Sequence, residues 1–160
     1  MKILFRIMAW SSLVIVLDFI SKLWASESLQ GEPSIALIPS FLYLTYHTNP
    51  GAAWGILQGQ QLFFAAITMV ALAIFFYWAL TADFKEKFFY SWALVLLIGG
   101  TIGNFIDRVR FGYVIDFIDV YLGSYNFPIF NIADAALTVG VIAFSFDLLF
   151  LESKRVNTDA

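Results

Sequence analysis

The chain has 160 residues, of which 61% are hydrophobic and only 13% are charged, and its formal net charge is −3. One water-soluble core cannot bury so much apolar surface, so the composition excludes an ordinary soluble domain and predicts an integral membrane protein. The nine basic residues are scattered, which excludes a nucleic-acid-binding surface. The absence of cysteine and the single histidine exclude thiol chemistry and a histidine-rich metal site.

Four apolar stretches are long enough to cross a bilayer, because a helix that spans roughly 30 Å of hydrocarbon needs about 20 mostly apolar residues. The predicted helices cover about residues 4–24, 61–81, 88–107 and 131–151. The first follows Lys2 and contains Arg6, as a secretory signal sequence does, but no small-x-small cleavage site comes after it. We therefore expect a retained signal anchor.

The basic residues predict how these helices are oriented, because lysine and arginine are retained on the cytoplasmic side of a membrane. Four crossings put both termini on one side. That side, with the short connector 81–87, carries six basic residues: Lys2, Arg6, Lys85, Lys87, Lys154 and Arg155. The other side carries three: Lys22, Arg108 and Arg110. Both termini are therefore expected in the cytoplasm, and the longer connectors, about 25–60 and 108–130, are expected on the outer side.

The two outer connectors differ in pattern. Residues 35–48 are enriched in β-branched and aromatic side chains, which predicts a short strand or hairpin on the membrane surface, interrupted at Pro39. The aromatic-rich segment 112–128 is too short for a second domain. In the third helix, Gly99 and Gly103 fit the small-xxx-small pattern that lets helices approach closely.

Charged side chains in apolar helices need an explanation, because each costs roughly 2.5 to 3.5 kcal/mol on insertion scales. Asp18 and Lys22 lie four residues apart on one face of the first helix, so they can form an ion pair or help to position a substrate. In the first outer connector, Asn49 and Pro50 favour a turn, and Gly51 permits unusual backbone angles or a close approach.

The outer end of the third helix carries a third polar group, formed by Asn104, Asp107 and Arg108. Asn104 and Arg108 share a helix face, and Asp107 lies one turn beyond Asn104 on an adjoining stripe. These residues could bind a ligand, or they could form a hydrogen-bonded cluster that holds the helix end together.

Two further aspartates are predicted on the outer side. Asp116 stands among apolar residues in the second outer connector, where it is poorly hydrated and needs a partner, and Asp119 follows three residues later. Asp134 is the third residue of the fourth helix, where it complements the helix dipole while Asn131 acts as an N-cap. Capping alone is a sufficient structural explanation for Asp134.

Asp116 and Asp134 could perform a specific reaction if they share one site. Repulsion and desolvation would raise the pKa of one carboxyl group, which leaves a protonated and an ionised partner. The ionised carboxylate can take a proton from water as the water attacks a peptide carbonyl, while the protonated carboxyl donates to the carbonyl oxygen. The candidate polar residues around such a pair are Asn49, Asn104, Arg108 and Asn131.

Two other classes of protein also fit these residues taken singly. A small transporter or channel subunit would use the intramembrane Asp18, Asn104 and Asp107. A non-catalytic assembly partner would use the face from Gly99 to Gly103.

Five motifs in order, D-F-I-S-K, N-P-G-A-A-W-G, G-N-F-I-D-R, V-I-D-F and F-N-I-A-D-A-A-L-T-V-G, closely resemble the bacterial lipoprotein signal peptidase (signal peptidase II) family. The match runs from about Asp18 to Gly140. The resemblance implies an all-α membrane protein with four transmembrane helices and a small β-cradle on the extracytoplasmic surface, forming one peptidase domain over residues 1–160. It places this domain in the bacterial cytoplasmic (inner) membrane, and we expect a monomer.

The resemblance also implies an aspartic endopeptidase that needs neither a metal nor a cofactor. Its substrate is a prolipoprotein whose lipobox cysteine carries a diacylglyceryl group, met within the membrane lipid and cut just before that cysteine. Asp116 and Asp134 are implied as the catalytic pair. The implied surrounding residues are Asp18, Lys22, Asn49, Gly51, Asn104, Asp107, Arg108 and Asn131, and Asp107 has a structural role.

Overall fold

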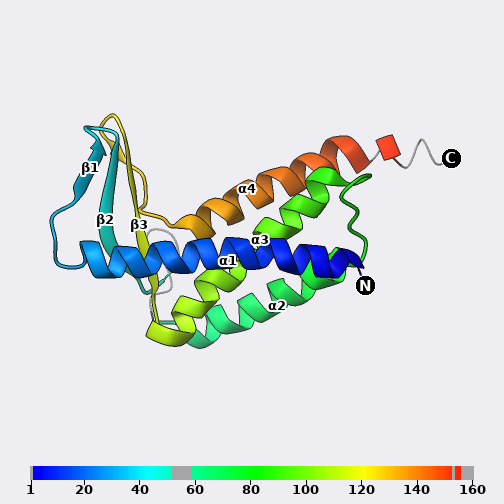
Figure 1. Ribbon diagram of the computed structural model, residues 1–160, viewed down its shortest axis with the longest axis horizontal. Coiled ribbons are helices and arrows are strands. Elements are labelled where there is room, and N and C mark those ends of the chain that lie inside the picture. Colours follow the sequence, from blue (N-terminus) through cyan, green and yellow to red (C-terminus); the bar gives the residue numbers. More distant parts are fainter. Residues whose placement is uncertain (1, 52–58, 153, 156–160) are drawn as a thin grey trace.

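The computed structural model describes residues 2–51, 59–152 and 154–155. In this part of the chain, four helices are long and apolar enough to cross a membrane, as the sequence predicts. They are α1 (Lys2–Leu29), α2 (Gln61–Ala79), α3 (Phe88–Phe111) and α4 (Ile132–Phe146), which continues into a π-helical segment, Asp147–Leu151. The start of α1 and the π-helical segment lie at the same end of the bundle (Figure 1).

Helix α3 is the central helix of the bundle. Of its apolar stretch 56% is buried, against 6 to 17% in the other three helices. Near the start of α1, a core formed by Ile7, Leu72, Leu94 and Ile98 joins α1, α2 and α3. The other helices therefore present most of their apolar side chains outward, where a bilayer would cover them.

Glycines in α3 bring the neighbouring helices close to it. A Cβ atom added to Gly99 would lie 2.7 Å from Cβ of Val14 in α1, and one added to Gly100 would lie 2.5 Å from the carbonyl oxygen of Ala133 in α4. A Cβ at Gly103 would lie 2.7 Å from an Asp18 carboxylate oxygen. The small-residue pattern is thus used for packing within the chain.

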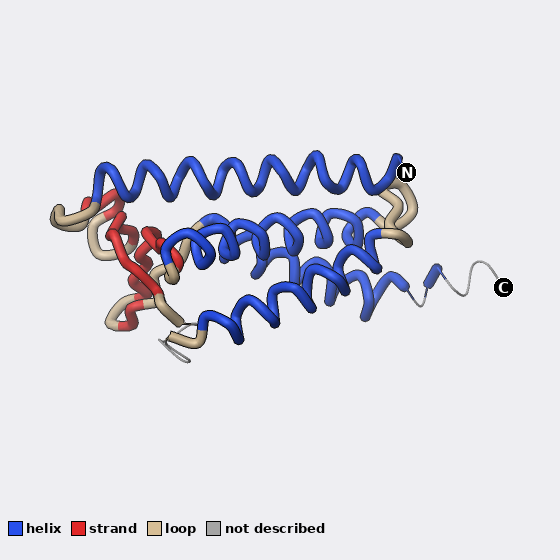
Figure 2. The backbone as a smooth tube through the Cα atoms, turned by 90° about the horizontal axis from the view of Figure 1, so that it is seen from below, coloured by secondary structure: helices blue, strands red, loops and turns tan. Residues whose placement is uncertain are grey.

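A small antiparallel sheet lies at the end of the bundle opposite the start of α1 (Figure 2). In the described residues its strands are β1 (Ile35–Ile38), β2 (Leu42–Asn49), β3 (Val114–Leu122) and β4 (Tyr125–Asn126), in that spatial order. The β1–β2 hairpin confirms the strand or hairpin predicted for residues 35–48. Phe117 of β3 packs against Ala25 and Leu29, so the sheet is anchored on the end of α1.

Residues 108–130, expected only as an outer connector, contain the end of α3 and the strands β3 and β4. Helix α3 continues to Phe111 and ends at Gly112, whose φ of 80° is the left-handed conformation that glycine favours at a helix end. Strand β3 follows, with apolar residues on both of its faces, and most of its residues are buried or half-buried. The alternation of apolar and polar residues that reveals a half-exposed strand is therefore missing from the sequence.

Candidate active site

A buried lysine is the centre of the polar cluster where α1, α3 and α4 meet. The ammonium group of Lys22 lies 2.8 Å from an Asp18 carboxylate oxygen and 3.0 Å from an Asp107 carboxylate oxygen, and it donates to the Asn104 side-chain oxygen at 3.0 Å. An ammonium group has three N–H donors, so these three acceptors satisfy it. Of the two roles open for Asp18 and Lys22, the structure shows the ion pair.

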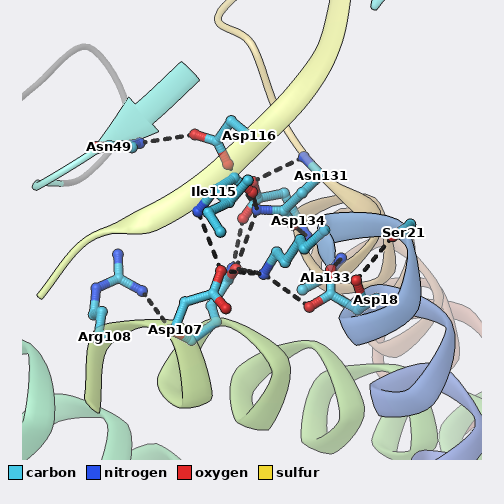
Figure 3. Close-up of polar contacts among 12 residues, drawn as sticks. Asp18, Ser21, Asn49, Asp107, Arg108, Ile115, Asp116, Asn131, Ala133 and Asp134 are labelled. Atoms are coloured by element: carbon cyan, nitrogen blue, oxygen red, sulfur yellow. Dashed lines mark hydrogen bonds and ion pairs between the residues drawn. The ribbon is translucent and has the colours of Figure 1, made fainter. Parts of the chain in front are cut away.

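The two carboxylates of this cluster also bind backbone groups. Asp18 accepts a hydrogen bond from the N–H of Ala133 in the first turn of α4, at 2.8 Å, and Asp107 accepts one from the N–H of Ile115 in β3, at 3.1 Å. Figure 3 shows both contacts, the one with Ile115 at β3 and the one with Ala133 beside α1. The ion-paired cluster therefore fixes the start of α4 and the path of β3 relative to α3.

Lys22 also sets the orientation of the Asn104 side chain. Because the Asn104 oxygen faces the cation, its amide nitrogen faces away and donates to the Asp134 carboxylate at 2.7 Å. The same Asn104 oxygen accepts a second hydrogen bond from Asn131, at 3.2 Å. The Lys22 ammonium group thus determines that Asp134 faces the amide nitrogen of Asn104 and not its oxygen.

Asn131 links Asp134 to Asp116. Its side-chain oxygen accepts from the backbone N–H of Asp134 at 2.8 Å, and the Asp134 carboxylate accepts from the backbone N–H of Asn131 at 3.3 Å, so the two residues form a capping box at the start of α4. The Asn131 amide nitrogen donates to the Asp116 carboxylate at 2.7 Å. The capping prediction is confirmed, and the cap residue itself contacts Asp116.

Asp116 lies within β3, whereas the sequence placed it on a loop. Only 1% of its surface is exposed, and both of its carboxylate oxygens accept hydrogen bonds, one from Asn131 and the other from Asn49 at 3.2 Å. Burial raises the pKa of Asp116 to about 7, and the negative charge of Asp134 adds to the rise, while the bonds from Asn49 and Asn131 oppose it. Asp119, with its side chain on the opposite face of the strand, accepts a hydrogen bond from Thr45 instead.

The turn after β2 joins this site to α3. The backbone N–H of Gly51 donates to the Asn49 side-chain oxygen at 3.0 Å, which confirms the predicted turn. Arg108 donates to the Gly51 carbonyl oxygen at 3.1 Å, and its guanidinium stacks on the ring of Phe64. The remainder of the N-P-G-A-A-W-G motif, residues 52–55, lies outside the described residues.

All ten residues singled out from the sequence belong to one connected set of contacts. These are Asp18, Lys22, Asn49, Gly51, Asn104, Asp107, Arg108, Asp116, Asn131 and Asp134. Sequence reasoning missed the backbone N–H groups of Ile115 and Ala133, because a backbone donor carries no residue-type signal. The arrangement offers two neighbouring carboxyl groups, one of them with a pKa near neutrality, in a largely water-excluded setting.

A family model described as signal peptidase (SPase) II matches residues 10–150. The chain belongs to the signal peptidase II family. A lipoprotein signal peptidase of Staphylococcus carnosus is 47% identical over 143 residues, which cover 88% of each chain. One of Staphylococcus aureus is 43% identical over 146 residues, or 91% of this chain and 89% of the relative. Signal peptidase II enzymes are aspartic peptidases, which agrees with the paired carboxyl groups.

Solved structures of similar proteins share the fold. A bacterial membrane enzyme determined by the in meso method at 2.3 Å resolution is 42% identical and has a TM-score of 0.82 over 90% of this chain and 87% of its own. A second, at 1.9 Å resolution, is 41% identical with a TM-score of 0.81, over 91% and 94%. The four-helix bundle with its sheet is therefore the fold of a bacterial membrane enzyme.

Proposed function

We propose that this chain is the endopeptidase that removes the signal peptide from prolipoproteins whose lipobox cysteine carries a diacylglyceryl group, cutting the bond just before that cysteine. The observation that carries the proposal is the link between two carboxylates through one amide, in which Asn131 donates to Asp116 and shares a capping box with Asp134. The relatives named lipoprotein signal peptidases support the choice of substrate.

The two carboxyl groups take different roles in this proposal. Asp116 holds the shared proton, because its pKa is raised to about 7. Asp134 is the ionised partner, since it accepts hydrogen bonds from the Asn104 amide and the Asn131 backbone at a helix N-terminus, where negative charge is stabilised.

The reaction follows from these protonation states. Asp134 takes a proton from a water molecule as the water oxygen attacks the peptide carbonyl carbon, and Asp116 gives its proton to the carbonyl oxygen. The resulting gem-diol collapses when its hydroxyl returns a proton to Asp116 and Asp134 passes its proton to the departing cysteine nitrogen. The C–N bond breaks, and both carboxyl groups regain their initial states.

The proposed orientation places one peptidase domain in the bacterial cytoplasmic membrane with both termini in the cytoplasm and the sheet outside. The six basic residues predicted on the inner side against three on the outer side support it. A substrate with two acyl chains partitions strongly into lipid, at roughly 0.8 kcal/mol per buried methylene, so it would reach the carboxylates laterally. Because Gly99 and Gly103 pack within the chain, we propose a monomer.

Cleavage of a purified prolipoprotein tests the function. The purified chain is incubated with a diacylglyceryl-modified prolipoprotein and, separately, with the same prolipoprotein lacking the lipid, and products are separated by gel shift. We expect cleavage before the cysteine of the modified substrate only. Equal cleavage of both substrates would contradict the proposed substrate class, and flux of ions into liposomes without proteolysis would support a transporter instead.

The raised pKa of Asp116 predicts how activity depends on pH. The proton that Asp116 donates is present below a pH of about 7 and is lost as the pH rises through that value, so kcat/KM should fall on the alkaline side. Because the hydrogen bond from Asn49 lowers this pKa, Asn49→Ala should move the alkaline limb to higher pH. The measurement is kcat/KM against pH for both proteins.

The control for this pH profile is Asn126→Ala, a change at an exposed residue of β4. It should leave the alkaline limb where it is in the unmodified chain. A limb that moves to lower pH in Asn49→Ala would mean that the amide does not stabilise the Asp116 carboxylate.

Two substitutions of Asn131 separate its capping from its contact with Asp116. Serine is about as good an N-cap as asparagine but lacks the amide donor, whereas alanine lacks both, and losing the cap costs about 1 kcal/mol. Both Asn131→Ser and Asn131→Ala should therefore reduce kcat, and the alanine variant should also melt at a lower temperature than the serine variant. The measurements are cleavage rate and thermal unfolding in detergent. Full activity in Asn131→Ser would show that the Asn131 amide has no part in the mechanism.

A further inference from the structure

A cavity lies beside Lys22 and Asp107, between the ends of α1 and α3 that are nearest the sheet. Its volume is about 160 Å³, and its walls include Phe19, Tyr46, Arg110, Phe111 and Tyr113. The residues of the candidate active site that reach it are the two ion-paired members Lys22 and Asp107. A space of this size accommodates several water molecules or a small polar group.

Arg110 brings an uncompensated positive charge to this cavity. Its guanidinium carbon lies 5.2 Å from the ring centroid of Phe19 and 4.8 Å from that of Phe111. Within the part of the chain that the structure describes, no carboxylate lies within ion-pair distance of Arg110 and no acceptor takes its N–H groups. The two rings hold the guanidinium plane in position while its five donors remain available.

Neutral hydrogen-bond donors stand beside this cation. The Tyr46 and Tyr113 phenols line the cavity, and burial raises the pKa of Tyr46, with Tyr113 adding to the rise, so this phenol keeps its proton. The carboxylate in the wall, Asp107, is ion-paired with Lys22 at 3.0 Å, a cation that it shares with Asp18, and it accepts a hydrogen bond from the backbone N–H of Ile115. Among the described residues that line it, the cavity therefore presents phenol donors and one cation without an ion-pair partner, Arg110, a combination that suits an anion.

The rim of the cavity is apolar and faces outward. Phe19, Leu23 and Phe111 expose 38%, 46% and 42% of their surfaces beside the opening. Phe19 and Leu23 continue the apolar surface of α1, which a bilayer would cover, so an occupant must combine a negative group with an apolar tail. A planar guanidinium matches the paired oxygens of a phosphate group.

We propose that this cavity binds the phosphate of an anionic phospholipid headgroup, with Arg110 as its cation and Tyr46 and Tyr113 as neutral donors. The acyl chains then lie along Phe19 and Leu23 on the lipid-facing side of α1. This site is separate from the carboxylate pair, and its existence does not depend on the proposed peptidase activity.

Lipid binding to the purified full-length chain in dodecyl maltoside micelles tests the site. Phosphatidylglycerol and phosphatidylcholine are titrated separately, and bound lipid is counted by native mass spectrometry while the melting temperature is recorded. We expect one phosphatidylglycerol molecule to bind saturably, at least about tenfold more tightly than phosphatidylcholine, and to raise the melting temperature. Arg110→Gln should weaken this binding about tenfold or more, because a charge-assisted hydrogen bond is lost.

Arg6→Gln is the matched control, because Arg6 also stacks on an aromatic ring, Phe84 at 4.6 Å, but belongs to the start of α1 at the other end of the bundle. Arg6→Gln should keep the affinity of the unmodified chain, and Tyr113→Phe should weaken binding less than Arg110→Gln does. Equal loss in the Arg6 and Arg110 variants, or equal affinity for both lipids, would overturn the site. If inorganic phosphate alone gives the same Arg110-dependent stabilisation, the cavity is a free-anion site and the assignment to a lipid is wrong.

Discussion

Replacing Asp116 or Asp134 by asparagine should abolish cleavage of a diacylglyceryl-modified prolipoprotein, with kcat lower by at least about a thousandfold. General acid–base catalysis contributes roughly 10² to 10⁴ in rate, and either change removes one proton carrier of the pair. Asparagine keeps the size of the side chain, and Asp134→Asn keeps a side-chain oxygen that can accept from the Asn131 backbone. The measurement is single-turnover cleavage, followed by gel shift.

Asp119→Asn is the matched control for this experiment. Asp119 lies on the same strand and is also buried, but it bonds Thr45 and has no contact with the carboxylate pair. We expect this variant to keep kcat within about threefold. Each protein is also melted in detergent, so that loss of fold is distinguished from loss of chemistry. Cleavage at an unchanged rate by a folded Asp116→Asn protein would show that the paired carboxylates are not the catalytic groups.

Replacing Lys22 by methionine should destabilise the protein by roughly 3 to 5 kcal/mol, because it leaves buried carboxylates without their counter-charge. Asp18 and Asp107 both lose their cation, and their side chains are only 1% and 4% exposed. The Asn104 oxygen also loses the donor that orients it, so its amide is free to turn away from Asp134. Thermal and denaturant unfolding in detergent measure the stability, and the cleavage rate measures the effect on the site.

Lys85→Met serves as the control, because Lys85 is an exposed residue of the connector between α2 and α3. It should change the free energy of unfolding by less than about 0.5 kcal/mol. The double variant Lys22→Met with Asp107→Asn should recover part of the stability, since it removes one of the unpaired charges. If Lys22→Met unfolds like the unmodified chain, the buried cluster is not what holds α1, α3 and α4 together.

The sequence was sufficient to predict the four helices and the β1–β2 hairpin. A bilayer demands long apolar stretches, so hydropathy and length alone locate the spans. The predicted helix ends were less accurate. Helix α1 continues to Leu29 and α3 continues to Phe111, because a helix does not have to stop where the hydrocarbon ends. Strand β3 could not be separated from a loop, because its covering residues come from distant parts of the chain.

The sequence by itself identified the charged and amide candidates, because charge is costly in apolar surroundings, and its five motifs grouped them into one expected site. Only the tertiary structure decided what each contacts. The bond from Ala133 to Asp18 joins residues 115 positions apart, and the bond from Asn49 to Asp116 joins residues 67 positions apart. The orientation of Asn104 and the raised pKa of Asp116 likewise depend on packing, because burial and neighbouring charges are properties of the folded chain.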